Sequence, residues 1–270
     1  MASSHQSDDD KDKLNKLKDL LEFGDKSFRN LKVDWMRIKR RKKTLLRMAT
    51  AIHAHTDSGH KLLLSGNIHS SEVLLRPILE TLINAEYILC GRNNETLNRF
   101  LTMSNTALIK KMETMLKFIA SNPDTKVSLS NVQLAEVIKG RKDENKEFAK
   151  QFNYKFVNAE IGVVDRVIRI DTEYKRLKKP QGFSRYWRYL TEYTLLSDKM
   201  HLSNHGLRYF MKESPTQVDL VFGGNADNVG NLVDAFYVHY TEMLRIMSSQ
   251  LKLVSFEDIK NFEDNYSLDN

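Results

Sequence analysis

The sequence has few of the residues that interrupt or crosslink a polypeptide. Among its 270 residues are 4 prolines, 11 glycines and 1 cysteine. So few turn-forming residues argue against an all-β protein, which needs many tight turns. A single thiol excludes an internal disulfide framework and predicts a reducing compartment. Because Cys90 lies in the apolar stretch 85–90, we expect its thiol to be buried and unreactive.

Long apolar segments are also missing. No run approaches the roughly 20 apolar residues that a helix needs to span a bilayer. The first ten residues are polar and acidic, whereas a secretory signal starts with basic residues followed by apolar ones. We therefore expect residues 1–10 to be a disordered lead-in, and we expect a soluble, cytoplasmic protein that does not contact membranes.

Several widespread functional motifs are absent as well. The sequence has no paired Cys-x-x-Cys and no nucleophile elbow. Gly223 and Gly224 do not form a phosphate-binding loop, because no Gly-Lys-Ser or Gly-Lys-Thr follows them. These absences exclude the commonest zinc-finger, hydrolase and nucleotide-binding classes, and the sequence predicts no cofactor.

Apolar residues at three- and four-residue spacing dominate the chain, which is the pattern of amphipathic helices. The segment 69–90 is apolar on several sides. This predicts a central core helix, kinked at Pro77. The alternating segment 218–222 fits a short strand, and the charged stretch 140–150 should lie between two helices. Helices are expected over 11–28, 33–64 with a candidate break at 56–59, 69–90, 95–121, 129–139, 157–176, 184–204 and 228–253.

These elements predict an all-α protein that folds as a single helical bundle with a long N-terminal helical extension. The extension should span residues 11–60 and the bundle domain residues 61–254. The helices 69–90 and 184–204 should pack together in its core. Residues 255–270 form an acidic tail in this reading.

Positive charge is concentrated in two regions of a chain whose formal net charge is +7. In the region nearer the C-terminus, Arg185 and Arg188 lie among the aromatic residues Tyr186, Trp187 and Tyr189. Basic clusters with interleaved aromatics are typical of nucleic-acid-binding surfaces, although a solvated helix face is the alternative. The region nearer the N-terminus lies within one predicted helix and comprises Arg37, Lys39, Arg40, Arg41, Lys42 and Lys43.

Two pairs of polar residues stand out on predicted core helices. Arg76 and Glu80 are four residues apart on the most apolar helix. Desolvating an unpaired charge costs several kcal/mol, so they form either a structural salt bridge or a pocket in which Arg binds phosphate. His201 and His205 share one helix face. They are weak candidates for a metal site, and a hydrogen-bonded pair at a helix end is the alternative.

The residues 71–89 resemble the first signature of a bacterial family known as a domain of unknown function, the DUF5677-type helical proteins. Its pattern is an Arg, a Glu four residues later, then an Asn and a Tyr, matched by Arg76, Glu80, Asn84 and Tyr87. A second signature, a Tyr followed by Leu-Ser and then His, is similar to residues 193–201. The resemblance covers roughly residues 62–253. It implies that the site residues are Arg76, Glu80, Tyr193, Ser197 and His201.

That family in turn resembles the HEPN helical bundles, many of which are RNA-cutting toxins or antiviral effectors. The resemblance implies that Arg76 and His201 form a polar pair at the bundle centre. The sequence departs from the HEPN motif, however, because no Arg precedes His201 by four to six residues on one helix. Arg47 and His53 have that spacing, but they lie in the basic N-terminal region.

Three functions remain open from the sequence. The first is RNA binding or metal-independent RNA cleavage, as in phage defence or a toxin system. His201 would then be the general acid/base and Arg76 would stabilise phosphorane charge. The second is a non-catalytic interaction or sensor module that works with a cognate protein partner or as a homodimer. The third is a helical metal-binding protein using His201 and His205.

Overall fold

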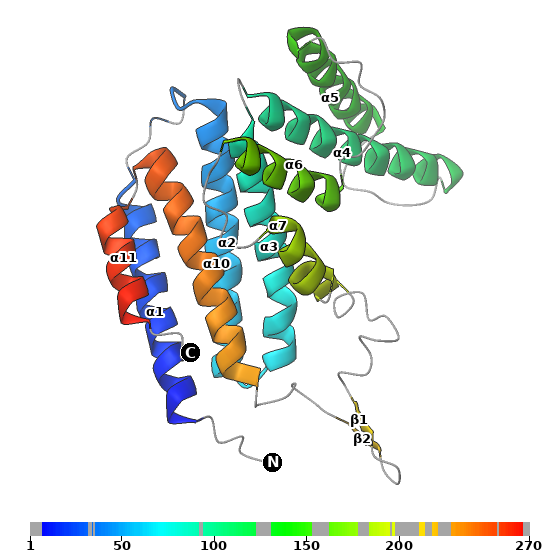
Figure 1. Cartoon of the computed structure of the whole chain (residues 1–270). Coiled ribbons are helices and arrows are strands. Elements are labelled where there is room, and N and C mark those ends of the chain that lie inside the picture. Colours follow the sequence, from blue (N-terminus) through cyan, green and yellow to red (C-terminus); the bar gives the residue numbers. More distant parts are fainter. Residues whose placement is uncertain are drawn as a thin grey trace. The chain divides into compact units, whose positions relative to one another are not determined.

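The structure is a computed structural model of the whole chain (Figure 1). It describes residues 7–31, 34, 36–91, 94–122, 131–152, 162–177, 184–194, 196–197, 211–213, 218–220, 228–252 and 254–266. Helices account for nearly all of these residues, so the predicted all-α helical fold is confirmed. The chain forms two compact units, one of residues 1–85 with 181–270 and the other of residues 86–180. Among the described helices, none is long and apolar enough to cross a membrane.

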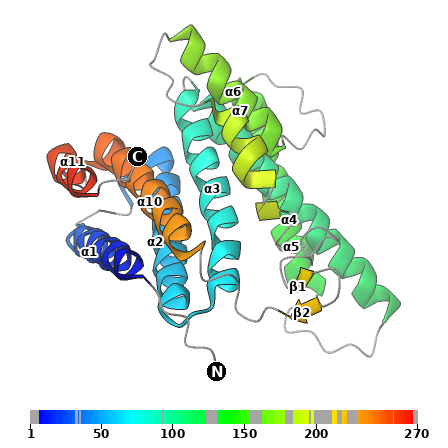
Figure 2. The ribbon, with the colours of Figure 1, turned by 60° about the horizontal axis from the view of Figure 1, so that its bottom comes forward.

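The first unit is built around α1 (Asp8–Arg29), α2 (Arg40–Leu64) and α10 (Val229–Leu251), which lie side by side in Figures 1 and 2. It also contains most of α3 (Ile68–Cys90) and the short segment α7 (Arg185–Arg188). That segment continues as a π-helical turn, η1 (Tyr189–Tyr193). The helix α11 (Phe256–Asn265) packs against α10. The largest fully buried side chains of this unit include Tyr240, Phe236, Leu14, Leu17, Leu20, Leu45 and Ile52.

The helix α1 begins at Asp8, three residues before the predicted start and inside the expected disordered lead-in. The reason is a capping box. The Ser7 hydroxyl accepts from the Asp10 backbone N–H, and the Asp10 carboxylate accepts from the Ser7 N–H. Acidic residues in the first turn also favour this helix end, because they offset its positive dipole.

The helix α2 differs from the prediction at its start and at the candidate break. It begins at Arg40 rather than at residue 33, so Arg37 and Lys39 precede it. It also continues without a break through residues 56–59. Gly59 allows close packing between two helices at this position. A Cβ at this position would lie 2.3 Å from the Phe236 ring, so the missing side chain lets α10 approach α2 closely.

The second unit contains α4 (Glu95–Ser121), α5 (Asn131–Phe152) and α6 (Val163–Arg176). The prediction ended α5 near residue 139, which is wrong, because the charged stretch 140–150 is helical. Its polar side chains have partners. The Asn105 amide on α4 donates to Glu144 at 3.0 Å and to Asn145 at 3.1 Å. Lys142 pairs with Glu113 at 2.7 Å, and Phe148 is buried.

The C-terminal elements match the prediction except in the acidic tail. The helix α10 is confirmed, and the predicted strand is β2 (Val218–Leu220), which pairs antiparallel with β1 (Met211–Glu213). Part of the expected tail is the helix α11, whose N-terminus is capped by the Ser255 hydroxyl. Tyr237 on α10 donates to the Phe262 carbonyl at 2.8 Å and so fastens α11 to α10.

Candidate functional site

A polar centre joins α3 to the π-helical turn η1. The Arg76 Nη2 donates to the Tyr193 hydroxyl at 3.2 Å, and that hydroxyl donates to the Glu80 Oε2 at 3.3 Å. The guanidinium also lies over the Tyr193 ring, 5.1 Å from its centroid. Arg76 and Glu80 are half-buried, and Tyr193 is 8% exposed. One hydroxyl thus links the Arg76 and Glu80 side chains of the apolar helix α3.

This arrangement brings Arg76 and Glu80 of the predicted site together with Tyr193, which is more than 110 positions away in sequence. Ser197 is half-buried in the helical residues that follow η1. His201 and His205 lie outside the described residues. Their predicted roles, catalytic for His201 and metal-binding for both, therefore stay predictions. Within the described ranges, no group of three or more His, Cys, Asp or Glu residues could hold a metal ion.

A ladder of three tyrosine rings runs along α7 and η1 and ends at the polar centre. The Tyr186 and Tyr189 rings are stacked with centroids 6.4 Å apart, and the Tyr189 and Tyr193 rings with centroids 5.1 Å apart. Tyr186 is 41% exposed, whereas Tyr193 is buried. Burial and the neighbouring Tyr193 and Tyr186 raise the pKa of Tyr189. The ladder therefore leads from the surface to Arg76.

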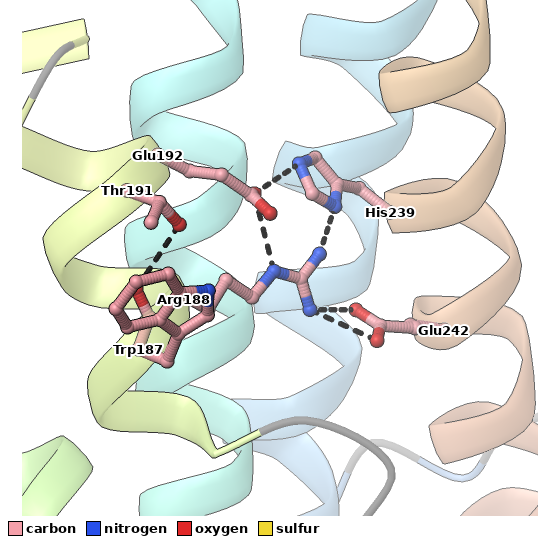
Figure 3. Close-up of polar contacts among 6 residues, drawn as sticks. All are labelled: Trp187, Arg188, Thr191, Glu192, His239 and Glu242. Atoms are coloured by element: carbon pink, nitrogen blue, oxygen red, sulfur yellow. Dashed lines mark hydrogen bonds and ion pairs between the residues drawn. The ribbon is translucent and has the colours of Figure 1, made fainter.

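A second polar network binds the same segment to α10 (Figure 3). Arg188 is buried at its centre. Its Nη1 donates to both carboxylate oxygens of Glu242, at 2.9 and 2.7 Å, and its Nε donates to Glu192 at 3.2 Å. Its Nη2 donates to the His239 Nδ1. Burial alone would lower the pKa of Arg188, but Glu242 and Glu192 outweigh burial and raise it.

The hydrogen bonds of this network determine the protonation of His239. Because a guanidinium only donates, the Nδ1 that faces Arg188 must be the unprotonated acceptor. The proton then resides on Nε2, which lies 3.4 Å from the Glu192 carboxylate. Burial and the adjacent Arg188 charge hold the pKa of His239 well below its usual value. A neutral His239 thus closes a ring of contacts with Arg188 and Glu192.

The predicted nucleic-acid-binding residues occupy different environments. Arg37, Lys39, Arg40 and Lys42 are exposed, while Arg41, Lys43 and Arg185 are half-buried. Leu45 and Ile52 pack inward from the same helix α2, as its amphipathic pattern predicts. Arg188 differs from the whole group. Its guanidinium is held inside by two carboxylates and so lies in the protein interior rather than on the basic surface.

His239, Glu192 and Glu242 were not predicted from the sequence. A usable signal existed for two of them. His239 and Glu242 are three residues apart on α10, whose other residues are mostly apolar. Polar groups on an apolar helix need partners, and this was the reasoning that singled out Arg76 and Glu80. Their partner, Arg188, is more than 50 residues away in sequence, so no local pattern identifies it.

Comparison with known proteins places the chain in one family. No curated protein and no solved structure matches it. The family of unknown function DUF5677 matches residues 42–218. This range starts before the roughly 62–253 span of the sequence resemblance and ends before α10. It includes Arg76, Glu80 and Tyr193 but leaves out His239 and Glu242. With most of its length matched, this chain belongs to the DUF5677 family.

Proposed function

We propose that this protein binds RNA, with Arg76, Glu80 and Tyr193 at the centre of the binding site. The observation that carries the proposal is the meeting of an Arg/Glu pair on an apolar helix with the inner end of an aromatic ladder. A guanidinium suits phosphate because its planar fork makes paired hydrogen bonds. Aromatic rings suit bases, which stack on them. The exposed basic residues around the start of α2 add attraction for a polyanion.

Cleavage of the bound RNA is the finer form of this proposal, as in a HEPN-like, metal-independent endoribonuclease of a defence or toxin system. Arg76 would stabilise the charge that develops on the phosphorane. A general acid/base is needed at the ribose 2′-hydroxyl, and His201 is the residue to test for that role. Glu80 would keep the Arg76 guanidinium oriented through the Tyr193 hydroxyl.

The binding test compares Arg76→Lys with Arg245→Lys. Both keep the positive charge, but Arg76→Lys loses the planar fork at the polar centre. Arg245 is an exposed residue paired with Glu263 and serves as the matched control. We expect Arg76→Lys to weaken RNA binding while Arg245→Lys leaves it unchanged. Equal affinity of both variants and wild type would refute a phosphate-binding role for Arg76.

Salt dependence tests the contribution of the basic residues. Affinity for single strands falls with salt, with a slope of about −0.7 per neutralised phosphate in a double logarithmic plot. The variant Arg40→Ala/Lys42→Ala should therefore flatten this slope. Binding that does not change between low and moderate salt would argue against phosphate contacts.

The cleavage test uses the wild type and His201→Ala on labelled RNA, with and without a chelator. We expect cleavage by the wild type in both conditions and none by His201→Ala. Cleavage that the chelator abolishes would instead support the metal-binding alternative with His201 and His205.

A non-catalytic interaction module is the second candidate, and one observation favours it. Within a single short segment, the residues Tyr186, Trp187 and Leu190 are 41%, 57% and 42% exposed. Neighbouring exposed apolar residues are typical of protein-binding surfaces. Native mass spectrometry and light scattering of the full chain test this candidate. A homodimer that Leu190→Ala dissociates would support it.

A further inference from the structure

At the outer end of the tyrosine ladder, the exposed Tyr186 offers a face on which one more flat ring can stack. At the inner end, the Arg76 guanidinium covers the Tyr193 ring. The rings of Tyr189 and Tyr186 continue the stack outward, nearly parallel, with interplanar angles of 20° and 13°. Tyr186 is 41% exposed and the adjacent Trp187 is 57% exposed. The stack is thus closed by a cation inside and offers aromatic surface outside.

The ladder is held in place before any ligand arrives. Tyr193 is fixed by its bonds to Arg76 and Glu80 on α3. One turn earlier, Arg188 fixes the same segment to α10 through Glu242. A surface held from two sides loses little conformational entropy when it binds, which favours affinity for a flat ligand.

The charges near the ladder favour a base over a phosphate as its ligand. Arg188 is neutralised by Glu242 and Glu192. With two carboxylates around one guanidinium, this network offers a phosphate no net attraction. A nucleobase carries no charge, and every base has a π-face that stacks on tyrosine or tryptophan. Phosphates would be contacted elsewhere, by Arg76 or by the basic residues of α2.

We infer that Tyr186, at the end of the ladder, and Trp187 beside it each stack an unpaired base, so that the protein selects single-stranded over duplex RNA. The inference rests on the proposed RNA binding and deepens it. In an A-form duplex the bases are already stacked and paired, so their faces are not available. Stacking does not read base edges, so selection should be for unpaired bases rather than for one sequence.

The first experiment measures binding of fluorescein-labelled RNA by anisotropy at one fixed salt concentration. The probes are a 12-nucleotide single strand, the same strand in a duplex, and the same strand with its central bases replaced by abasic sites. We expect the intact single strand to bind best. The abasic strand keeps its phosphates, so its weaker binding would isolate the contribution of the bases. Equal affinity for all three would overturn the inference but leave RNA binding intact, whereas no binding of any probe would overturn both.

The second experiment compares Tyr186→Ala and Trp187→Ala with Leu190→Ala. Leu190 is as exposed as Tyr186, lies one turn further along, and has no π-face. We expect each aromatic variant to weaken single-strand binding roughly 5- to 150-fold, the usual range for one stacked base, with the abasic strand unaffected. Leu190→Ala should bind like the wild type. If all three variants weaken binding equally, or instead change the oligomeric state, the segment is a protein-binding surface and the inference is wrong.

Intrinsic fluorescence gives an independent readout. The chain has two tryptophans, so Trp35→Phe leaves Trp187 as the reporter. Stacking predicts that the intact single strand quenches its emission and that the abasic strand does not. Quenching by both strands to the same extent would contradict base stacking.

Discussion

Replacing Arg188 by Met should destabilise the protein, because it removes the donor at the centre of a buried network. The substitution leaves the Glu242 carboxylate without its two bonds from Nη1 and the His239 Nδ1 without the bond from Nη2. Removing one partner of a buried ion pair costs about 3–5 kcal/mol. Solvent can compensate part of this, since the Glu242 and Glu192 side chains are 25% and 43% exposed. We therefore expect a loss of about 2–3 kcal/mol.

Urea denaturation followed by circular dichroism at pH 7 measures this loss, and the midpoint of thermal unfolding should fall by about 4–12 °C. The double variant Arg188→Met/Glu242→Gln is the control, because it also removes the stranded charge. We expect it to recover about 1 kcal/mol or more relative to Arg188→Met. Two results would refute the reasoning. One is an Arg188→Met protein as stable as wild type, and the other is a double variant no more stable than Arg188→Met.

Four further predictions follow from packing and burial. Gly59→Ala should cost about 1–3 kcal/mol in denaturation, because its Cβ meets the Phe236 ring. Gly140→Ala, which has open space around it within α5, should be neutral or gain about 0.5–1 kcal/mol. Burial lowers the pKa of His60, so the unfolded state takes up this proton first as pH falls. Stability should therefore drop from pH 6.5 downward until the folded-state pKa is reached, and His60→Gln should reduce the drop between pH 7.5 and 5. Burial raises the pKa of the Cys90 thiol to about 11. A disulfide reagent at pH 8 should therefore label it slowly in the native protein and fully in denaturant, and fast native labelling would contradict its burial.

The sequence was sufficient to predict those helices that have uninterrupted apolar spacing. The helices α3 and α10 follow their predicted bounds closely because each has at least one continuously apolar side. The second half of α5 was missed since charged residues dominate it, and they find partners on α4 that are 29–40 residues away. The start of α2 was placed too early because a run of basic residues contains no apolar spacing from which a helix end can be read.

The candidate site could be predicted only for residues that a local sequence pattern marks. Arg76 and Glu80 stood out as charges on an apolar helix, and the family resemblance added Tyr193. The stacking of Tyr186 on Tyr189 was not predicted, and neither was the π-helical turn, because side-chain spacing does not specify the hydrogen-bond register of one turn. Arg188 was assigned to the surface from its basic and aromatic neighbours in sequence. Its burial depends on carboxylates that the fold brings from α10.

The π-helical turn holds one residue more than the same stretch of an α-helix would. On a regular α-helix, residues five apart point about 140° away from each other. In η1 the wider turn brings the fifth residue closer to the direction of the first, near the place that the fourth residue has on an α-helix. Arg188, which contacts α10, and Tyr193, which contacts α3, are five residues apart across this turn. Deleting one residue between them should therefore restore the α-helical register and leave both side chains near their present directions, whereas inserting one should turn one of them away from its partners.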